Sequence, residues 1–303
     1  MIMLAKSLVL IAAGTLAVAL AATPGSAQSK PQHLNNIVAL LDSGKPVFGI
    51  FSGEKTPEGA VGASEIPGAD FVFYSMESGP FDVPRMQIYM QFLLDRAELV
   101  KQDSVFNELP VVLRIPPIRD GHTQAQDRTK QGLDAGVVGI VFPHVETAEE
   151  ARLAIASMRF RGARDPEGVR PPDIGDAARY WGVDAQAYHQ AADLWPLKPD
   201  GDLINILLIE DKVGVANARE ITSTKGVSVV IPGPGDLRRA YEGDDEAIEN
   251  AIQTVLAACK ASGVVCGITA GPDDIGKRLD EGFRFFIVTG PEAIPVGRRH
   301  AGR

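Results

Sequence analysis

Short apolar runs recur along the chain, and most of them are continuous rather than alternating between apolar and polar residues. Continuous runs are typical of parallel β-strands that are covered on both faces. Eight strands are predicted on this basis: Val47–Phe51, Phe71–Tyr74, Val111–Ile115, Val138–Phe142, Ile204–Ile209, Val227–Ile231, Val264–Ile268 and Phe283–Val288. The chain therefore has enough buried strands to build a large parallel sheet.

Helical patterns lie between these runs. The predicted helices are Arg85–Val100, Gln124–Leu133, Thr147–Met158, Val213–Glu220, Asp245–Ala261 and Asp273–Asp280. Thr147 followed by Glu150 forms a capping box, which marks the start of one helix. Strands that alternate with helices predict an α/β protein, a (β/α)8 TIM barrel in a single domain. A doubly wound open sheet is the alternative, but the absence of Gly-x-Gly-x-x-Gly after the first strand disfavours a dinucleotide-binding version.

Residues 1–27 have the pattern of a secretory signal peptide. A positively charged start is followed by the apolar run Leu8–Ala22, and Gly25 and Ala27 are the small residues before the expected cleavage site. An uncleaved membrane anchor is the alternative, although the run is short for a span of roughly 20 residues. We expect cleavage after Ala27, a mature domain of residues 28–303 and a secreted or periplasmic location.

Composition narrows the range of partners. The mature domain would have 276 residues (303 − 27), which suits a barrel of about 250 residues. A formal net charge of −9 and the lack of a basic stripe make nucleic acid an unexpected partner, and no segment beyond the leader is apolar enough for a membrane.

Cys259 and Cys266 lie in apolar surroundings and are expected to be buried free thiols. A disulfide is the alternative in an exported protein, but a helix position and a strand position pair poorly.

Two acidic residues stand at the ends of neighbouring predicted strands. Glu210 directly follows Ile204–Ile209, and Asp236 lies in the Gly-Pro loop after Val227–Ile231. The carboxyl ends of parallel strands meet at one rim of a barrel, where the active sites of α/β proteins lie. Carboxylate oxygens are the ligands that hard divalent cations such as Mg²⁺ and Mn²⁺ prefer. Each acid alone has a structural alternative, a helix cap or a turn, but together they favour a metal site.

Two irregular segments follow the third and fourth strands. Pro116–Thr123 carries Arg119, Asp120 and His122 to the same rim. Arg159–Asp202 is long, charged and rich in proline and glycine, and we expect it to fold over the barrel mouth.

Four segments extend this pattern, in order along the chain: PVVLRIP (110–116), LDAGVVGIVFPHVETAEEA (133–151), LLIEDKVGVANAREI (207–221) and IPGPGDL (231–237). The series resembles the HpcH/HpaI aldolase family, the metal-dependent class II pyruvate aldolases of the citrate lyase beta-like superfamily. The resemblance runs from about Leu41 to Val288 and implies a TIM barrel.

The resemblance also implies roles for matching residues. Glu210 and Asp236 would bind Mg²⁺ or Mn²⁺, with Co²⁺ as an alternative. A 2-oxo acid such as pyruvate would chelate the cation, which stabilises the enolate formed on bond cleavage. Arg114 would add positive charge beside the keto oxygen. Asp134 and Glu77 match acidic positions of the family's catalytic site.

The loop at Pro232–Leu237 would hold the substrate carboxylate through backbone amides. Gly233 and Gly235 permit a close approach, and Leu237 retains an N–H group in the same loop. The family's second strand usually ends in Asp-x-Glu-His, where this chain has Ser75-Met76-Glu77-Ser78, and this match places Ser78 among the expected substrate-binding residues.

Ser78 is also the main departure from the family, because it stands where the acid/base histidine is usually found. Serine does not shuttle protons near neutral pH without an activating neighbour. Three accounts remain open: His122 supplies the imidazole, metal-bound water works with Glu77 or Asp134, or the protein binds a 2-oxo acid without cleaving it. His144 is interpreted as a loop or capping residue that reaches the mouth.

The leading functional expectation is a lyase that cleaves a 4-hydroxy-2-oxo acid to pyruvate, or a related oxo acid, and an aldehyde. The alternatives are a citryl- or malyl-type lyase and a 2-oxo acid-binding protein without turnover. Family members commonly end in a longer helix that packs on a neighbouring subunit. The segment Thr289–Arg303 has two prolines and three glycines and does not predict such a helix. A homo-oligomer is therefore an open expectation, and a family-like hexamer is not expected.

Overall fold

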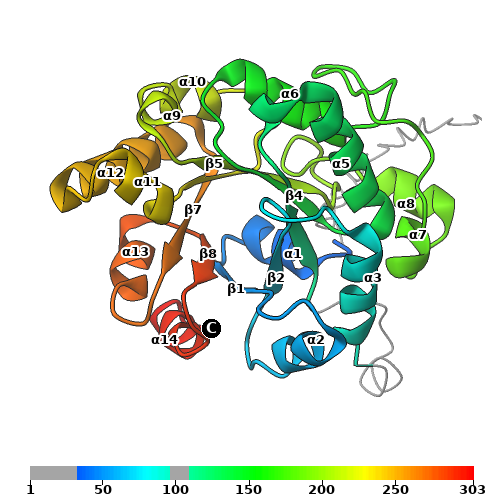
Figure 1. The fold of residues 1–303 in the computed structure, drawn as a ribbon, viewed down its shortest axis with the longest axis horizontal. Helices are drawn as coiled ribbons and strands as arrows, with labels where there is room; N and C mark the ends of the chain where they lie inside the picture. The colour runs from blue at the N-terminus through cyan, green and yellow to red at the C-terminus, as the bar shows by residue number, and fades with distance from the viewer. Residues whose placement is uncertain (1–32, 96–108) are drawn as a thin grey trace, which may run out of the picture. The chain divides into compact units, whose positions relative to one another are not determined.

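The computed structural model describes residues 33–95 and 109–303; the predicted signal peptide and the end of the helix predicted for Arg85–Val100 lie outside them. Eight parallel strands form a closed barrel in sequential order, with helices around it (Figure 1). The strands are β1 (Val47–Phe51), β2 (Phe71–Ser75), β3 (Val111–Arg114), β4 (Gly139–Phe142), β5 (Ile204–Ile209), β6 (Val229–Pro232), β7 (Val265–Ala270) and β8 (Phe285–Val288). The predicted (β/α)8 barrel is confirmed, and the open-sheet alternative is excluded.

The helices match the predicted pattern in most places. They are α1 (Asn36–Asp42), α2 (Pro57–Ser64), α3 (Val83–Phe92), the 3-10 turn η1 (Ile118–Asp120), α5 (His122–Ala135), α6 (Ala148–Met158), α7 (Ala177–Tyr180), α8 (Ala185–Ala191), α9 (Lys212–Ala216), α10 (Ala218–Thr222), α11 (Pro234–Ala240), α12 (Asp245–Ser262), α13 (Ile275–Glu281) and α14 (Ala293–His300). Both reciprocal bonds of the capping box at Thr147 and Glu150 are present. The helix predicted for Val213–Glu220 is instead two short helices that meet at Asn217.

The barrel closes where β1 pairs with β8, with Val47 opposite Phe285 and Ile50 opposite Val288. Phe48 stacks on Phe286 across this seam, with ring centroids 5.4 Å apart. Both aromatic residues are fully buried. Burial of a side chain of this size contributes about 1.5–3 kcal/mol, so the seam holds the barrel closed by apolar contact as well as by backbone hydrogen bonds.

The connection Arg159–Asp202 lies at the end of the barrel where the strands begin, so the expectation that it folds over the mouth is wrong. It leaves the end of α6 and leads into β5. Trp195 Nε1 donates to Asp42 Oδ1 (3.3 Å), just before β1, and Ser228 Oγ, just before β6, donates to the backbone oxygen of Trp195. A helix-to-strand connection must return to the amino end of the next strand. The mouth is therefore left to the shorter loops that follow the strands.

A helix does form near the C-terminus, contrary to expectation. In α14 the side chains of Ala293 and Ile294 are buried against the barrel, and a Cβ at Gly297 would lie 2.6 Å from the Phe48 ring. Arg303 then donates from Nη1 and Nη2 to the buried Asp70, both at 2.9 Å. Proline and glycine lower the intrinsic helix propensity of this segment, but tertiary packing outweighs propensity.

The two cysteines are buried free thiols, as expected. Their sulfur atoms nevertheless lie 2.6 Å apart, because α12 and β7 run side by side after the left-handed turn at Gly263. Burial raises the pKa of the Cys266 thiol, and the Cys259 sulfur acts in the same direction. Among the described residues, no helix combines the length and the apolarity needed to cross a membrane.

Candidate metal centre at the barrel mouth

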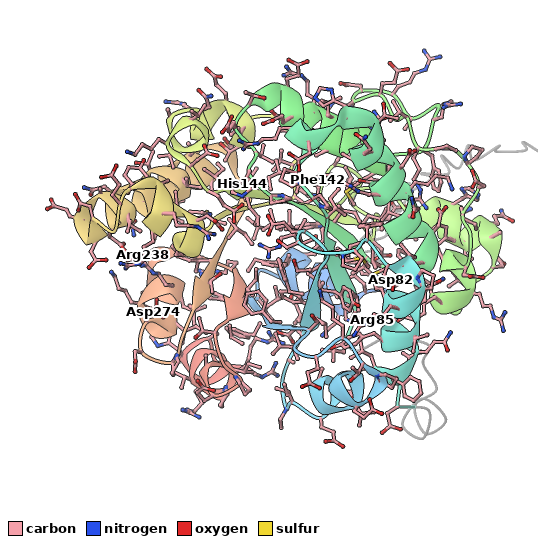
Figure 2. All side chains as sticks on the ribbon, viewed as in Figure 1. Asp82, Arg85, Phe142, His144, Arg238 and Asp274 are labelled. Atoms are coloured by element: carbon pink, nitrogen blue, oxygen red, sulfur yellow. The ribbon has the colours of Figure 1, made fainter. Side chains whose placement is uncertain are left out.

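Strands β2 to β6 bring one group of polar residues together at their carboxyl ends. Glu77 follows β2, Arg114 ends β3, His144 follows β4, Glu210 follows β5, and Asp236 lies in the first turn of α11 after β6. Figure 2 labels His144 near Phe142, the last residue of β4. Arg114, Glu210 and Asp236 line a cavity of about 440 Å³ at this mouth. Glu210 and Asp236 therefore lie at the same rim of the barrel.

Glu210 is the most deeply buried of these acids, with a side chain that is 3% exposed. Its Oε2 accepts a hydrogen bond of 3.0 Å from the backbone N–H of His144. Burial raises the pKa of Glu210 to about 8, and the charges of Asp236 and Glu77 act in the same direction. Gly233 leaves room for the carboxylate, since a Cβ there would lie 2.6 Å from Glu210 Cγ. A cation would stabilise this carboxylate in its charged form.

His144 places an imidazole between two carboxylates. Its Nδ1 lies 3.7 Å from Glu210 Oε2, and its Nε2 lies 3.9 Å from Glu77 Oε1. One ligand atom from each of the three side chains lies within 4.8 Å of the other two. Two carboxylates and an imidazole at this spacing fit a divalent cation.

The backbone of His144 is held in an unusual conformation. Its φ is +53°, in the left-handed region that residues other than glycine rarely adopt. Arg119 donates from Nη2 to the backbone oxygen of His144. The same guanidinium contacts Glu146 Oε1 (2.8 Å) and Asp211 Oδ2 (3.3 Å). Burial and the neighbouring Asp211 raise the pKa of Glu146. Arg119 thus ties together the loops that follow β3, β4 and β5.

The sequence interpretation of His144 as a loop or capping residue missed its place in this cluster. The one available signal is its position just after Phe142 and Pro143, at the same rim as Glu210. The contacts that turn the imidazole inward come from Arg119 and Glu210, which are distant in sequence.

Two residues of β2 and one that follows it position the guanidinium of Arg114. Nε donates to Ser75 Oγ at 2.9 Å, and Nη2 lies 3.0 Å from Glu77 Oε2. The guanidinium carbon lies 5.4 Å from the centroid of the Phe73 ring. Because guanidinium stays protonated, Arg114 places a permanent positive charge at the mouth.

Asp236 shares the cavity with Glu210, but its carboxylate accepts a hydrogen bond from Arg239 Nη2. It does not belong to the three-residue ligand group formed by Glu77, His144 and Glu210. The side chain of Arg239 is 79% exposed, and an exposed ion pair of this kind is weak. The assignment of Asp236 as a metal ligand remains a prediction.

The predicted carboxylate-binding loop is helical, because α11 begins at Pro234. A Cβ at Gly235 would meet no atom within 4 Å, so the backbone there is open to the mouth. The amide of Leu237 donates to the backbone oxygen of Gly233 at 3.0 Å, and its side chain is buried. Contrary to expectation, Leu237 has no amide available for a substrate.

The other three predicted site residues lie outside the cluster. Ser78 is exposed in the bend after β2, and His122 is the exposed first residue of α5. Asp134 lies in the last turn of α5, at the end of the barrel where the strands begin. The structure does not bring Asp134 or His122 to Glu210, because α5 starts near the mouth with an outward-facing residue and then runs away from it.

Asp134 belongs to a structural network at that far end. Its Oδ1 lies 3.4 Å from Arg170 Nη2, and its Oδ2 accepts a hydrogen bond from Lys130 Nζ. Arg170 is almost fully buried, with its guanidinium over the Phe160 ring and 3.0 Å from the Tyr188 hydroxyl. Asp134 therefore supplies a counter-charge to a buried cation.

Asp134→Asn is expected to lower the free energy of unfolding by about 2–3 kcal/mol, because it leaves a buried guanidinium without its anion. Affinity for Mn²⁺ should stay within about threefold of the parent protein. Urea unfolding and Mn²⁺ titration measure the two effects. Lys130→Gln, which removes only the more exposed partner, is the control and should cost less than about 1 kcal/mol. Loss of Mn²⁺ binding in a folded Asp134→Asn variant would contradict this placement.

Comparison with known proteins shows the family of the chain. Residues 48–290 match the family model described as HpcH/HpaI aldolase/citrate lyase. Hydroxypyruvate/pyruvate aldolase of Delftia acidovorans is 31% identical over 268 residues, covering 84% of this chain and 86% of that protein. 5-keto-4-deoxy-D-glucarate aldolase of Salmonella gallinarum is 31% identical over 167 residues, covering 54% of this chain and 60% of that protein.

The barrel also resembles a solved structure, that of an HpcH/HpaI aldolase/citrate lyase family protein from Burkholderia cenocepacia. The TM-score is 0.68 at 22% identity, covering 88% of this chain and 97% of that one, which supports the fold. With its family match over most of the barrel, the chain belongs to the HpcH/HpaI aldolase/citrate lyase family.

Proposed function

We propose that the protein is a divalent-metal-dependent carbon–carbon lyase that cleaves a 4-hydroxy-2-oxo acid to pyruvate, or a related oxo acid, and an aldehyde. The observation that carries the proposal is the juxtaposition, at the barrel mouth, of the Glu77–His144–Glu210 ligand group with the guanidinium of Arg114. The carboxylates attract a divalent cation, and the guanidinium of Arg114 adds a second positive charge beside them. Two positive charges at the mouth suit an anionic oxo acid as the substrate. The aldolase names of two relatives support the same reaction class.

The reaction is a retro-aldol cleavage. The hydroxyl at C4 loses its proton, the C3–C4 bond breaks to release the aldehyde, and the electron pair passes into the enolate of the oxo acid. The enolate then takes a proton at C3 to give the product. A bound divalent cation would supply positive charge next to the 2-oxo group. Arg114 would donate to the oxygen at C2, where negative charge develops.

The sequence left two proton routes open, one through His122 and one through metal-bound water with Glu77 or Asp134, and the geometry supports the second through Glu77. His122 is exposed outside the cluster, and Asp134 lies at the other end of the barrel. Glu77 is at the site, with Oε2 paired to Arg114 and Oε1 turned toward His144. We propose that the proton leaves through Glu77 and water.

The absence of a histidine at position 78 favours the second candidate, a 2-oxo acid-binding protein without turnover. Release of pyruvate from 4-hydroxy-2-oxo acids of different chain length separates the candidates, measured with and without added Mn²⁺. Metal-dependent release supports the lyase. Binding of pyruvate and metal without release from any of these substrates supports the binding protein. Release from citryl- or malyl-type substrates alone supports the third candidate, a lyase for those acids.

A further inference from the structure

Two independent features single out His144 from the other histidines that the structure describes. Its imidazole lies between Glu210 and Glu77, and its backbone adopts a left-handed conformation that is uncommon for residues other than glycine. Both of its backbone polar groups are also engaged, the N–H by Glu210 and the carbonyl by Arg119. Strained backbone that is held by its surroundings is typical of functional sites.

We propose that His144 is a nitrogen ligand of the metal centre, which makes this a mixed nitrogen–oxygen site that prefers late transition metals to Mg²⁺. The inference rests on the proposed function only in that a divalent cation binds at the mouth. Glu210 Oε2 and His144 Nδ1 are 3.7 Å apart. Two ligands that each lie about 2.1 Å from one ion are separated by roughly 3–4 Å. The pair can therefore bind one cation with little movement.

Of the three residues that could ligate one ion, Glu77 lies beside the other ring nitrogen of His144, and we assign it as the partner of the imidazole rather than as a direct ligand. Histidine that binds a metal through one ring nitrogen generally donates its other N–H to a carboxylate, which fixes the ring orientation. Here Nε2 faces Glu77 Oε1 at 3.9 Å, and Glu77 Oε2 is held by Arg114. One chain of contacts thus runs from Arg114 through Glu77 to His144, which would share the cation with Glu210.

A nitrogen ligand changes which metal the site selects. Mg²⁺ takes oxygen ligands almost exclusively, whereas imidazole suits Co²⁺, Ni²⁺, Zn²⁺ and Mn²⁺ to differing degrees. The site as predicted from the sequence contains only carboxylates, so Mg²⁺ is an equal candidate there. With His144 in place, we expect Co²⁺ to bind at least about 100-fold more tightly than Mg²⁺.

His144→Gly tests the proposal without a folding penalty, because glycine adopts a φ of +53° freely. The first readout is pulsed electron paramagnetic resonance of bound Mn²⁺, which detects a coordinated imidazole nitrogen through its hyperfine coupling. We expect this coupling in the parent protein, its loss in His144→Gly, and its return when free imidazole is added to the variant.

The second readout is the ratio of the Co²⁺ and Mg²⁺ dissociation constants, measured by titration of the metal-free protein. His144→Gly should lower the preference for Co²⁺ by about 10- to 100-fold and change Mg²⁺ affinity by less than about threefold. Glu242→Gly is the matched control, since Glu242 is an exposed residue with a φ of +55° outside the site. It should keep both the coupling and the ratio.

Each outcome is decisive. Mn²⁺ bound without nitrogen coupling in the parent protein, or an unchanged metal ratio in His144→Gly, overturns the nitrogen ligand and leaves the proposed lyase standing. Nitrogen coupling together with no pyruvate release supports the ligand and rejects the lyase. A protein that binds none of these cations overturns both proposals.

Discussion

Replacement of Glu210 by glutamine is expected to abolish metal binding and, at the same time, to stabilise the metal-free protein at alkaline pH. The carboxylate is the most buried anion at the mouth and the one that Asp236, Glu77 and His144 all face. Glutamine has nearly the same shape, and its Oε1 still accepts the hydrogen bond from His144. Affinity for Mn²⁺ should fall at least about 100-fold, because a charged ligand is lost.

The stability effect follows from the direction of the pKa shift. The pKa of Glu210 is raised from the ordinary 4.5 to about 8 in the folded protein, mainly by burial. Below pH 4.5 the group is protonated in both the folded and the unfolded chain, so it costs nothing. As pH rises toward 8, the unfolded chain ionises first, and the folded state becomes progressively less stable. Glutamine removes this penalty.

Thermal melts in chelator measure the effect. At pH 5 the two proteins should have similar Tm, and at pH 9 Glu210→Gln should be more stable by about 3 kcal/mol. Glu65→Gln, at an exposed acid, is the control and should change neither metal affinity nor the pH dependence. Wild-type Mn²⁺ affinity in Glu210→Gln would reject the metal centre. Equal Tm values at pH 9 would show that neighbouring groups already offset the free-energy cost of ionising the buried Glu210 carboxylate.

The fold was predictable because its signals are local. The runs Val47–Phe51 and Ile204–Ile209 have the same bounds in the sequence pattern and in the structure, since buried parallel strands need little beyond continuous apolar residues. The start of α6 was predictable from the capping box. The position of Glu210 at the mouth was predictable for the same reason, because it depends only on its place directly after a strand.

The rest of the site depends on contacts between distant segments. The inward turn of His144 needs Arg119 from the loop after β3 and Glu210 from the end of β5, and nothing in the local sequence specifies either contact. Asp134 matched a family motif, yet its helix carries it to the far end of the barrel. The Gly-Pro-Gly segment at Gly233 indicated a loop, although proline at the first helical position is also a common helix start.

Replacement of Arg114 is expected to have the second large effect, on turnover rather than on metal binding. Its guanidinium is a fixed cation beside the ligand group, bonded to Ser75 Oγ and Glu77 Oε2 and placed over the Phe73 ring. A donor that is held in place before negative charge develops does not have to reorganise during the reaction. Arg114→Met should therefore lower kcat by about 10²- to 10³-fold. Mn²⁺ affinity should change by less than about threefold, since the contacts of Arg114 are to Ser75, Glu77 and Phe73 and not to the ligand pair His144 and Glu210.

Arg114→Lys separates charge from geometry. Lysine keeps the positive charge, but a single ammonium group does not reproduce the planar fork that binds Ser75 and Glu77 together. We expect kcat to remain at least about tenfold below that of the parent protein, and Ser75→Ala, which removes one of the two contacts, to fall between the parent and Arg114→Lys. Steady-state pyruvate release and Mn²⁺ titration on the same preparations measure both quantities. Full activity in Arg114→Lys would mean that charge alone suffices, and full activity in Arg114→Met would remove Arg114 from the reaction. A loss of kcat that follows the number of retained contacts would instead show that the rate depends on how β2 positions the guanidinium.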